Sequence, residues 1–132
     1  MNKIIIASGP VIVENNNVLL NQHGDTEFWK FCGGKVEDFE HDLIEHASRE
    51  VKEEMGIKIK IINQRPFLMH TKKKTSNGFV DVILVHFLAE RIGEITPGND
   101  IRKWKWIPIS ELTKENLAPN ILPTLKHFGF IK

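Results

Sequence analysis

Three glutamates at helical spacing are the residues in this sequence best suited to chemistry. Glu50, Glu53 and Glu54 stand at positions i, i+3 and i+4, so on a helix they project from one side. Like charges at this spacing repel each other, and each pair destabilises an isolated helix by roughly 0.2–0.5 kcal/mol. Hard divalent cations prefer oxygen ligands, and Mg²⁺ commonly binds a few carboxylates together with phosphate oxygens. The spacing therefore indicates either a cation site for phosphate chemistry or a solvated acidic face.

The segments on either side of these glutamates favour the cation site. Gly33-Gly34-Lys35-Val36-Glu37 leads through a loop to Arg49-Glu50-Val51-Lys52-Glu53-Glu54-Met55-Gly56-Ile57. This pattern resembles the signature of the MutT/Nudix hydrolase family, G-x5-E-x7-R-E-U-x-E-E-x-G-U, in which U is a bulky aliphatic residue. Gly34 and Glu40 match its first spacing, and residues 49–57 match its entire second half. Agreement at so many fixed positions is specific, and it places the family's motif, the Nudix box, at about residues 34–57.

The resemblance implies a fold, an activity and a cofactor. The fold would be α/β, a Nudix-type α/β/α sandwich in which the Nudix helix and a C-terminal helix pack outside a mixed β-sheet. The activity would be Mg²⁺-dependent hydrolysis of a diphosphate bond in a nucleoside diphosphate derivative, with Mn²⁺ as a substitute metal. Glu50, Glu53 and Glu54 would bind the metal with help from a backbone carbonyl near Gly33. Glu53, or else Glu50, would act as the general base.

The sequence departs from the family pattern at two places. Between Glu40 and Arg49 lie eight residues where the pattern has seven, so the loop carries one extra residue. Either Glu37 or Glu40 is therefore expected to pair with Arg49, because a planar guanidinium binds carboxylates in a bidentate manner. Cys32 stands where relatives commonly have proline, and we expect a small buried residue there rather than a reactive thiol.

Recognition of the substrate is expected to involve residues outside the helix. Asn120 resembles the position that binds the purine edge in MutT-type nucleoside triphosphatases, since an amide offers a donor beside an acceptor. Its alternative role is a helix cap. Trp29 and Phe31 would either stack on a base or fill the core, and Lys35 would contact phosphate or remain solvated. The run Lys72-Lys73-Lys74 is interpreted as a solvated tip rather than a phosphate clamp.

A further carboxylate is expected at Asp100, outside the Nudix box. Asp100 lies six residues before Trp106, ahead of the run Trp106-Ile107-Pro108, and this resembles a later acidic position of the family. Because Pro97 and Gly98 mark a loop, Asp100 could move onto the metal when substrate arrives. The alternative is an aspartate that shapes its own turn.

Three functions compete at the level of sequence. Hydrolysis of a nucleoside triphosphate is favoured, because the chain lacks the tyrosine typical of diadenosine polyphosphate hydrolases and a proline at the ADP-ribose-hydrolase distance. A nucleotide sensor or regulator on the same fold is disfavoured, since such domains usually lose glutamates from the box and this chain retains them. Removal of pyrophosphate from RNA 5′ ends is disfavoured by the net charge of only +1.

The elements that must position these residues are strands and two helices. A helix is expected at Asp42–Met55, with Asp42 as its N-cap, Glu45 completing a capping box and Gly56 at its end. Its buried stripe should contain Ile44, Ala47, Ser48, Val51 and Met55. Strands are expected at Ile4–Glu14, Val18–Gln22, Phe28–Cys32, Ile57–Thr71, Phe79–Ala89 and Trp104–Ile107, and a closing helix at Pro119–Phe128.

The composition fits one domain spanning residues 1–132. The single cysteine excludes an internal disulfide and fits a reducing compartment. Met1–Val13 is interpreted as a strand rather than a signal peptide, because Pro10 and Glu14 interrupt its apolar run. No apolar run reaches membrane-spanning length. We therefore expect a cytoplasmic monomer or homodimer that acts on a small nucleotide-like substrate, with no membrane partner and no strong signal for nucleic-acid binding.

Overall fold

The computed structural model describes residues 3–132, and Met1 and Asn2, which begin the segment compared above with a signal peptide, lie outside the described residues. The strands are β1 (Ile4–Glu14), β2 (Asn17–His23), β3 (Gly34–Lys35), β4 (Lys58–Ile61), β5 (Phe67–Thr75), β6 (Gly78–Ile92) and β7 (Ile101–Pro108). The helices are α1 (Leu43–Met55), the 3₁₀-helix η1 (Ile109–Lys114) and α2 (Ile121–His127). None of these helices is long and apolar enough to cross a membrane, as judged over residues 3–132.

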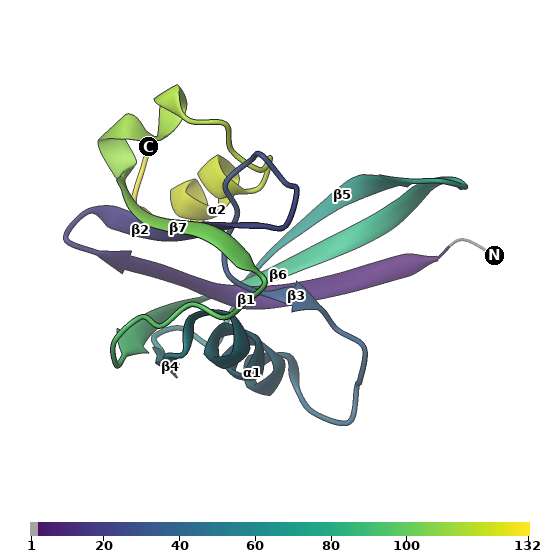
Figure 1. Ribbon diagram of the computed structural model, residues 1–132, viewed down its shortest axis with the longest axis horizontal. Coiled ribbons are helices and arrows are strands. Elements are labelled where there is room, and N and C mark those ends of the chain that lie inside the picture. Colours follow the sequence, from purple (N-terminus) through teal and green to yellow (C-terminus); the bar gives the residue numbers. More distant parts are fainter. Residues whose placement is uncertain (1–2) are drawn as a thin grey trace.

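Strand β1 lies at the centre of the sheet. Its residues 4–12 pair in parallel with residues 81–89 of β6, whereas the other strand pairs within residues 3–132 are antiparallel. The strand order is β4-β6-β1-β2-β7, with β5 also on β6 and β3 also on β1. The second edge of β1 is shared, because residues 7–8 pair with β3 and residues 13–14 pair with β2. The sheet therefore forks beside β1, and the prediction of a mixed sheet is confirmed (Figure 1).

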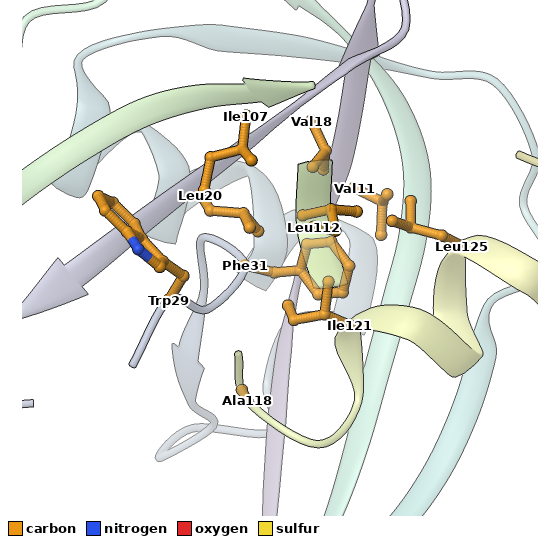
Figure 2. Packing of buried hydrophobic residues seen from close by; sticks show 10 residues of the cluster. All are labelled: Val11, Val18, Leu20, Trp29, Phe31, Ile107, Leu112, Ala118, Ile121 and Leu125. Carbon is orange, nitrogen blue, oxygen red and sulfur yellow. The ribbon is translucent and has the colours of Figure 1, made fainter. Parts of the chain in front are cut away.

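The two α-helices cover opposite faces of this sheet (Figure 1), as an α/β/α sandwich requires. Successive residues of a strand point to opposite faces, so Val11 enters the cluster packed against α2 while Ile12 enters the cluster packed against α1. We call these the α2-side core and the α1-side core. Figure 2 shows the α2-side core, which contains Val11, Val18, Leu20, Trp29, Phe31, Ile107, Leu112, Ala118, Ile121 and Leu125. The α1-side core contains Ile12, Leu19, Cys32, Val51, Met55 and Ile57.

Helix α1 forms with the predicted ends. The Asp42 side chain accepts a hydrogen bond of 2.8 Å from the backbone N–H of Glu45, and Gly56 ends the helix with a left-handed φ of 70°. The predicted stripe is buried at Ala47, Val51 and Met55. Two polar residues, His46 and Glu54, are buried with it. The face of α1 that meets the sheet is therefore not wholly apolar.

The strand predicted at Phe28–Cys32 is not formed, and that prediction is wrong. The segment makes only isolated bridges, from Lys30 to Asn21 and from Trp29 to Leu117. Trp29 and Phe31 both enter the α2-side core, so the segment crosses over the sheet instead of extending it.

The apolar stretch Ile57–Thr71 forms two strands instead of one. The Asn63 side chain accepts a hydrogen bond of 2.9 Å from the backbone N–H of Arg65, which makes a local turn. Pro66 follows and has no N–H to donate to a ladder. As a result β4 pairs with residues 89–92 of β6, and β5 pairs with residues 78–86 of the same strand.

Two leucines of α2 offer a matched test of this packing. Leu125 is fully buried in the α2-side core, whereas Leu122 on the same helix is 36% exposed. Leu125→Ala should lower the free energy of unfolding by about 2–5 kcal/mol, because it removes buried methyl groups and leaves a cavity. Leu122→Ala should cost less than about 1 kcal/mol. Urea titrations monitored by circular dichroism measure both values, and equal losses in the two variants would contradict the placement of α2.

Candidate active site

Helix α1 divides its three glutamates between the interior and the surface. Glu54 is 7% exposed, the Glu50 side chain is 20% exposed, and Glu53 is exposed. The i, i+3, i+4 spacing thus brings the three carboxylates together but places them at different depths. A carboxylate as deeply buried as that of Glu54 is costly unless hydrogen-bond donors reach it.

Glu54 is approached by two partners from other segments. The backbone N–H of Gly33 donates a hydrogen bond of 2.7 Å to Oε1. The His23 ring atom Nε2 lies 2.6 Å from Oε2, but the ring is not angled to form a hydrogen bond with that oxygen. The Gly33 amide is therefore the directed donor that stabilises this buried carboxylate.

Gly33 reaches Glu54 because the chain crosses very close to β1. A Cβ atom on Gly9 of β1 would lie 1.8 Å from the backbone oxygen of Cys32, so no other residue fits there without moving the chain. Gly33 itself has a φ of 135°, and a Cβ on it would lie 2.4 Å from the backbone oxygen of Ser8. The crossing occurs at the fork of the sheet, between the pairings of β1 with β3 and with β2.

Glu50 is approached by a histidine that the sequence analysis did not identify. His46 Nε2 lies 3.3 Å from Glu50 Oε1 and 3.1 Å from the backbone oxygen of Lys35. Because a carbonyl only accepts, Nε2 carries the ring proton and Nδ1 accepts from the Ser8 hydroxyl at 2.6 Å. Burial lowers the pKa of His46, so the ring is neutral and presents an N–H beside Glu50. The only sequence signal was a histidine four residues before Glu50.

The electrostatic environment of Glu50 disfavours its charge. Burial raises the pKa of Glu50, and the neighbouring carboxylates of Glu54 and Glu53 raise it further, against the opposing effect of Arg49. The carboxylate lies close to Gly34, the first residue of the box, since a Cβ on Gly34 would be 2.9 Å from Glu50 Oε2. Ionising Glu50 therefore costs free energy that a bound cation would recover.

Glu50 and Glu53 open onto a surface pocket. Its walls are Lys35, Glu37, Arg49, Glu50 and Glu53. The ion pairs within residues 3–132 do not join Arg49 to either Glu37 or Glu40, the two predicted partners. Glu40 is exposed in the loop before α1, where its backbone N–H donates to the Asp38 carboxylate at 2.7 Å. The loop folds onto itself at Glu40, so of the two predicted partners only Glu37 shares a pocket with Arg49.

A second cavity, of about 380 Å³, adjoins this region. Its apolar walls include Ala7, Phe28, Phe31, Val82, Leu84 and Ala118. Its polar walls include Lys30, Lys72, Lys73, His86 and Asn120. One end of the cavity is formed by residues 32–34, so Gly33 and Gly34 border both the cavity and the glutamates of α1.

The predicted base-binding residues divide between the cavity and the core. Phe31 lines the cavity, whereas Trp29 packs only into the α2-side core, where its ring is 9% exposed. Asn120 precedes α2 but makes no capping hydrogen bond with its side chain. Its Nδ2 instead lies 2.9 Å from Nε2 of His86 on the cavity wall.

The charged residues predicted around the substrate lie in different places. Lys35 lines the pocket of Glu50 and Glu53. Lys72 and Lys73 are exposed, in agreement with a solvated run, and both also line the cavity. Asp100 is exposed and lies in neither pocket; its backbone oxygen accepts a hydrogen bond of 3.5 Å from Gly24.

The carboxylates of α1 fit a hard divalent cation by their chemistry. Two of them face a shared pocket, and a third lies behind them on the Gly33 amide. Because burial and the neighbouring acids raise the pKa of Glu50, a bound cation would favour the ionised carboxylate. Within residues 3–132, no three His, Cys, Asp or Glu side chains are already arranged to hold a metal ion. A cation would therefore have to draw the three carboxylates closer together.

Comparison with protein families identifies the chain. The sequence model of the NUDIX domain matches residues 6–128. The chain belongs to the NUDIX family. It is therefore a hydrolase of the class that acts on nucleoside diphosphate derivatives, and NUDIX hydrolases generally need a divalent metal.

Solved structures of NUDIX proteins share the fold of the chain. A MutT NUDIX hydrolase from Burkholderia pseudomallei superposes with a TM-score of 0.75 at 22% identity, over 95% of this chain and 98% of that one. The ORF135 protein of E. coli gives 0.74 at 23% identity, over 96% and 89%. A mutator MutT protein from Bacillus halodurans gives 0.72 at 25% identity, over 94% and 81%. No curated protein matches the chain.

The buried histidine of the cavity makes this NUDIX hydrolase sensitive to acid. Burial lowers the pKa of His86 from 6.5 to about 4, and nearby Lys30 lowers it further, against the hydrogen bond to Gly9. Between these values the unfolded chain binds a proton that the folded chain does not. His86 should therefore lower the free energy of unfolding by about 1.4 kcal/mol per pH unit as the pH falls below 6.5.

Urea unfolding at pH 7 and pH 5 measures this effect. His86→Gln should weaken the pH dependence of the free energy of unfolding. His41→Gln, at an exposed position before α1, should leave that dependence unchanged. Identical pH dependence in the wild type and in His86→Gln would show that His86 does not titrate as its burial requires.

Proposed function

We propose that the chain hydrolyses a diphosphate bond of a nucleoside triphosphate and releases a nucleoside monophosphate and pyrophosphate. The observation that supports this most is the shared border formed by Gly33 and Gly34. On one side lie the glutamates of α1, and on the other lies a largely apolar cavity of about 380 Å³, which suits a nucleobase. A nucleotide with its base in the cavity would direct its phosphates toward the glutamates.

The proposed metal ligands are Glu50, Glu53 and Glu54, with the backbone carbonyl of Gly33 and, once substrate has bound, Asp100. A bound Mg²⁺, or Mn²⁺ in its place, would neutralise phosphate charge and activate water. Glu53 is our first choice for the general base, since it is exposed on the outer pocket, and Glu50 is the second. The base accepts the proton of the attacking water, whose oxygen forms a bond to phosphorus. The leaving group, either pyrophosphate or the nucleoside monophosphate, takes up the electron pair of the broken P–O bond.

The remaining residues have supporting roles in this proposal. Asn120 and Phe31 contact the base from the cavity wall, and Lys35 contacts a phosphate from the pocket of Glu50 and Glu53. Arg49 shapes that pocket with Glu37 rather than touching the substrate. Trp29 supports the cavity from the core behind it.

One observation favours a second candidate, the removal of pyrophosphate from RNA 5′ ends. Lys30, Lys72 and Lys73 line the same cavity, which gives it a local positive charge despite the net charge of +1. Such a cluster would also attract the phosphates of a longer strand.

A substrate panel tests the proposed reaction. With Mg²⁺ in excess over the nucleotide, the protein should release pyrophosphate from at least one common nucleoside triphosphate, and EDTA should abolish the release. The panel includes a 5′-triphosphorylated RNA, and product chromatography identifies the cleaved bond. Preference for the RNA would support the second candidate, and metal-dependent turnover of neither substrate would contradict both.

Charge-removing variants separate chemistry from folding on α1. Burial and the neighbouring acids raise the pKa of Glu50, so the stability this group contributes is lost as the pH rises through its folded pKa. Glu50→Gln should therefore raise the melting temperature of the metal-free protein at pH 7. Turnover by Glu50→Gln and Glu53→Gln should fall by about a hundredfold, or ~2.7 kcal/mol in activation free energy.

Glu45→Gln on the exposed first turn of α1 serves as the matched control, because it removes the same charge from the same helix. Its turnover should stay within about threefold of the wild type. Near-normal turnover in Glu50→Gln or Glu53→Gln would show that the residue is only part of a solvated acidic face and takes no part in the reaction.

A further inference from the structure

His86 and Asn120 form a buried polar pair on the wall of the cavity. Each side chain is 5% exposed, and both line the cavity. His86 comes from β6 and Asn120 from the residue before α2, and their atoms Nε2 and Nδ2 lie 2.9 Å apart. On its other side, Nδ1 of His86 lies 3.2 Å from the backbone oxygen of Gly9. The imidazole on β6 thus links the residue before α2 to the adjacent strand β1.

The direction of each hydrogen bond in this chain is fixed by chemistry. The Gly9 carbonyl can only accept, so Nδ1 of His86 must carry a proton. Burial holds the pKa of His86 at about 4, so at neutral pH the ring has no second proton. Nε2 is then an acceptor, and Asn120 must present its N–H₂ group rather than its oxygen.

The imidazole is also held in place by packing. The rings of Phe31 and His86 have centroids 4.8 Å apart and are tilted by 55°. Phe31 is itself 3% exposed in the α2-side core, so the ring of His86 cannot turn over without disturbing that core. The orientation of the Asn120 amide is therefore set before any ligand binds.

This orientation leaves the oxygen Oδ1 of Asn120 as the unused acceptor. Among the hydrogen bonds within residues 3–132, the Asn120 side chain makes only the one to His86. The cavity walls combine residues without a side-chain donor, such as Val82, Leu84 and Ala118, with the ammonium groups of Lys30, Lys72 and Lys73. No hydrogen bond within residues 3–132 joins these lysines to Asn120. An acceptor in such surroundings favours a ligand that donates to it, because an unmatched polar group in a largely apolar cavity is costly.

We propose that His86 is a positioning residue for base selectivity: it fixes Asn120 as an acceptor, so the cavity selects bases that carry an amino group. The inference rests on the proposed function, since it assumes that the base enters this cavity. A purine with an amino group at position 6 or position 2 is favoured over the same purine without one.

The test measures binding without metal and without turnover. Purine, adenine and 2-aminopurine ribonucleoside 5′-monophosphates are titrated into the wild-type protein by calorimetry. At least one of the two amino-bearing ligands should bind about tenfold or more tightly than purine monophosphate. If purine monophosphate binds as tightly as both, or if none of the three binds, the proposal is overturned.

Three variants separate orientation from shape. His86→Leu removes the acceptor at Nε2. The ratio of the affinity for the better amino-bearing ligand to that for purine monophosphate, here called the amino-to-purine ratio, should then fall to within about threefold of unity. His86→Gln can still accept from Asn120 and should restore part of the ratio. Leu84→Val alters the apolar wall and should weaken all three ligands alike. An unchanged ratio in His86→Leu, or a loss of ratio in Leu84→Val, would contradict a positioning role.

Nitrogen-15 spectra of the wild-type histidines decide the case even where a variant fails to fold. His86 should show the tautomer protonated at Nδ1, and an Nε2-protonated ring would overturn the proposal. Because these measurements need no hydrolysis, a protein that binds amino purines selectively but turns over no triphosphate would refute the proposed function and leave this inference standing.

Discussion

The hydrogen bond from the Gly33 amide to the Glu54 carboxylate is the interaction on which the arrangement of the site depends. A carboxylate only 7% exposed needs a donor, so α1 can dock on the sheet only where the loop brings Gly33 to it. Gly33 in turn reaches that position only because Gly9 leaves room for the crossing chain. The helix, the loop and β1 are thereby fixed relative to one another. The approach of Glu50 to Gly34 and the end of the cavity at Gly33 both follow from this crossing.

Helix α1 could be predicted from the sequence because its signals are local. Asp42, Glu45 and Gly56 act within a few residues of the helix ends, and the glutamate spacing needs only the helical period. The contacts of His46 with Ser8 and of His86 with Asn120 could not be predicted from the sequence, because they join residues 38 and 34 positions apart. The strand at residues 28–32 was wrongly predicted because apolar and aromatic residues fill cores as well as strands. The segment meets β2 only at the bridge between Lys30 and Asn21, and its aromatic residues Trp29 and Phe31 pack into the α2-side core.

The net charge of +1 does not describe the local charge of the two pockets, because three glutamates line one of them and three lysines line the other. Acidic side chains gather on α1 around Glu50, while Lys30, Lys72 and Lys73 gather at the cavity. A charge sum taken over the sequence cancels two local fields that a bound ligand would meet separately. The run of lysines in β5 illustrates the point. The run is exposed, as the sequence predicts, and the pairing of β5 with β6 also brings two of its members to the cavity wall.

The two cores on opposite faces of β1 also bear on how such a protein could diversify. The glutamates belong to the helix that packs on one face, whereas His86 and Asn120 belong to elements that meet the other. Substitutions at sites without shared contacts usually have additive effects. A lineage could therefore change the α2-side lining residue by residue, and drift from one base to another, while the hydrolytic helix is inherited intact.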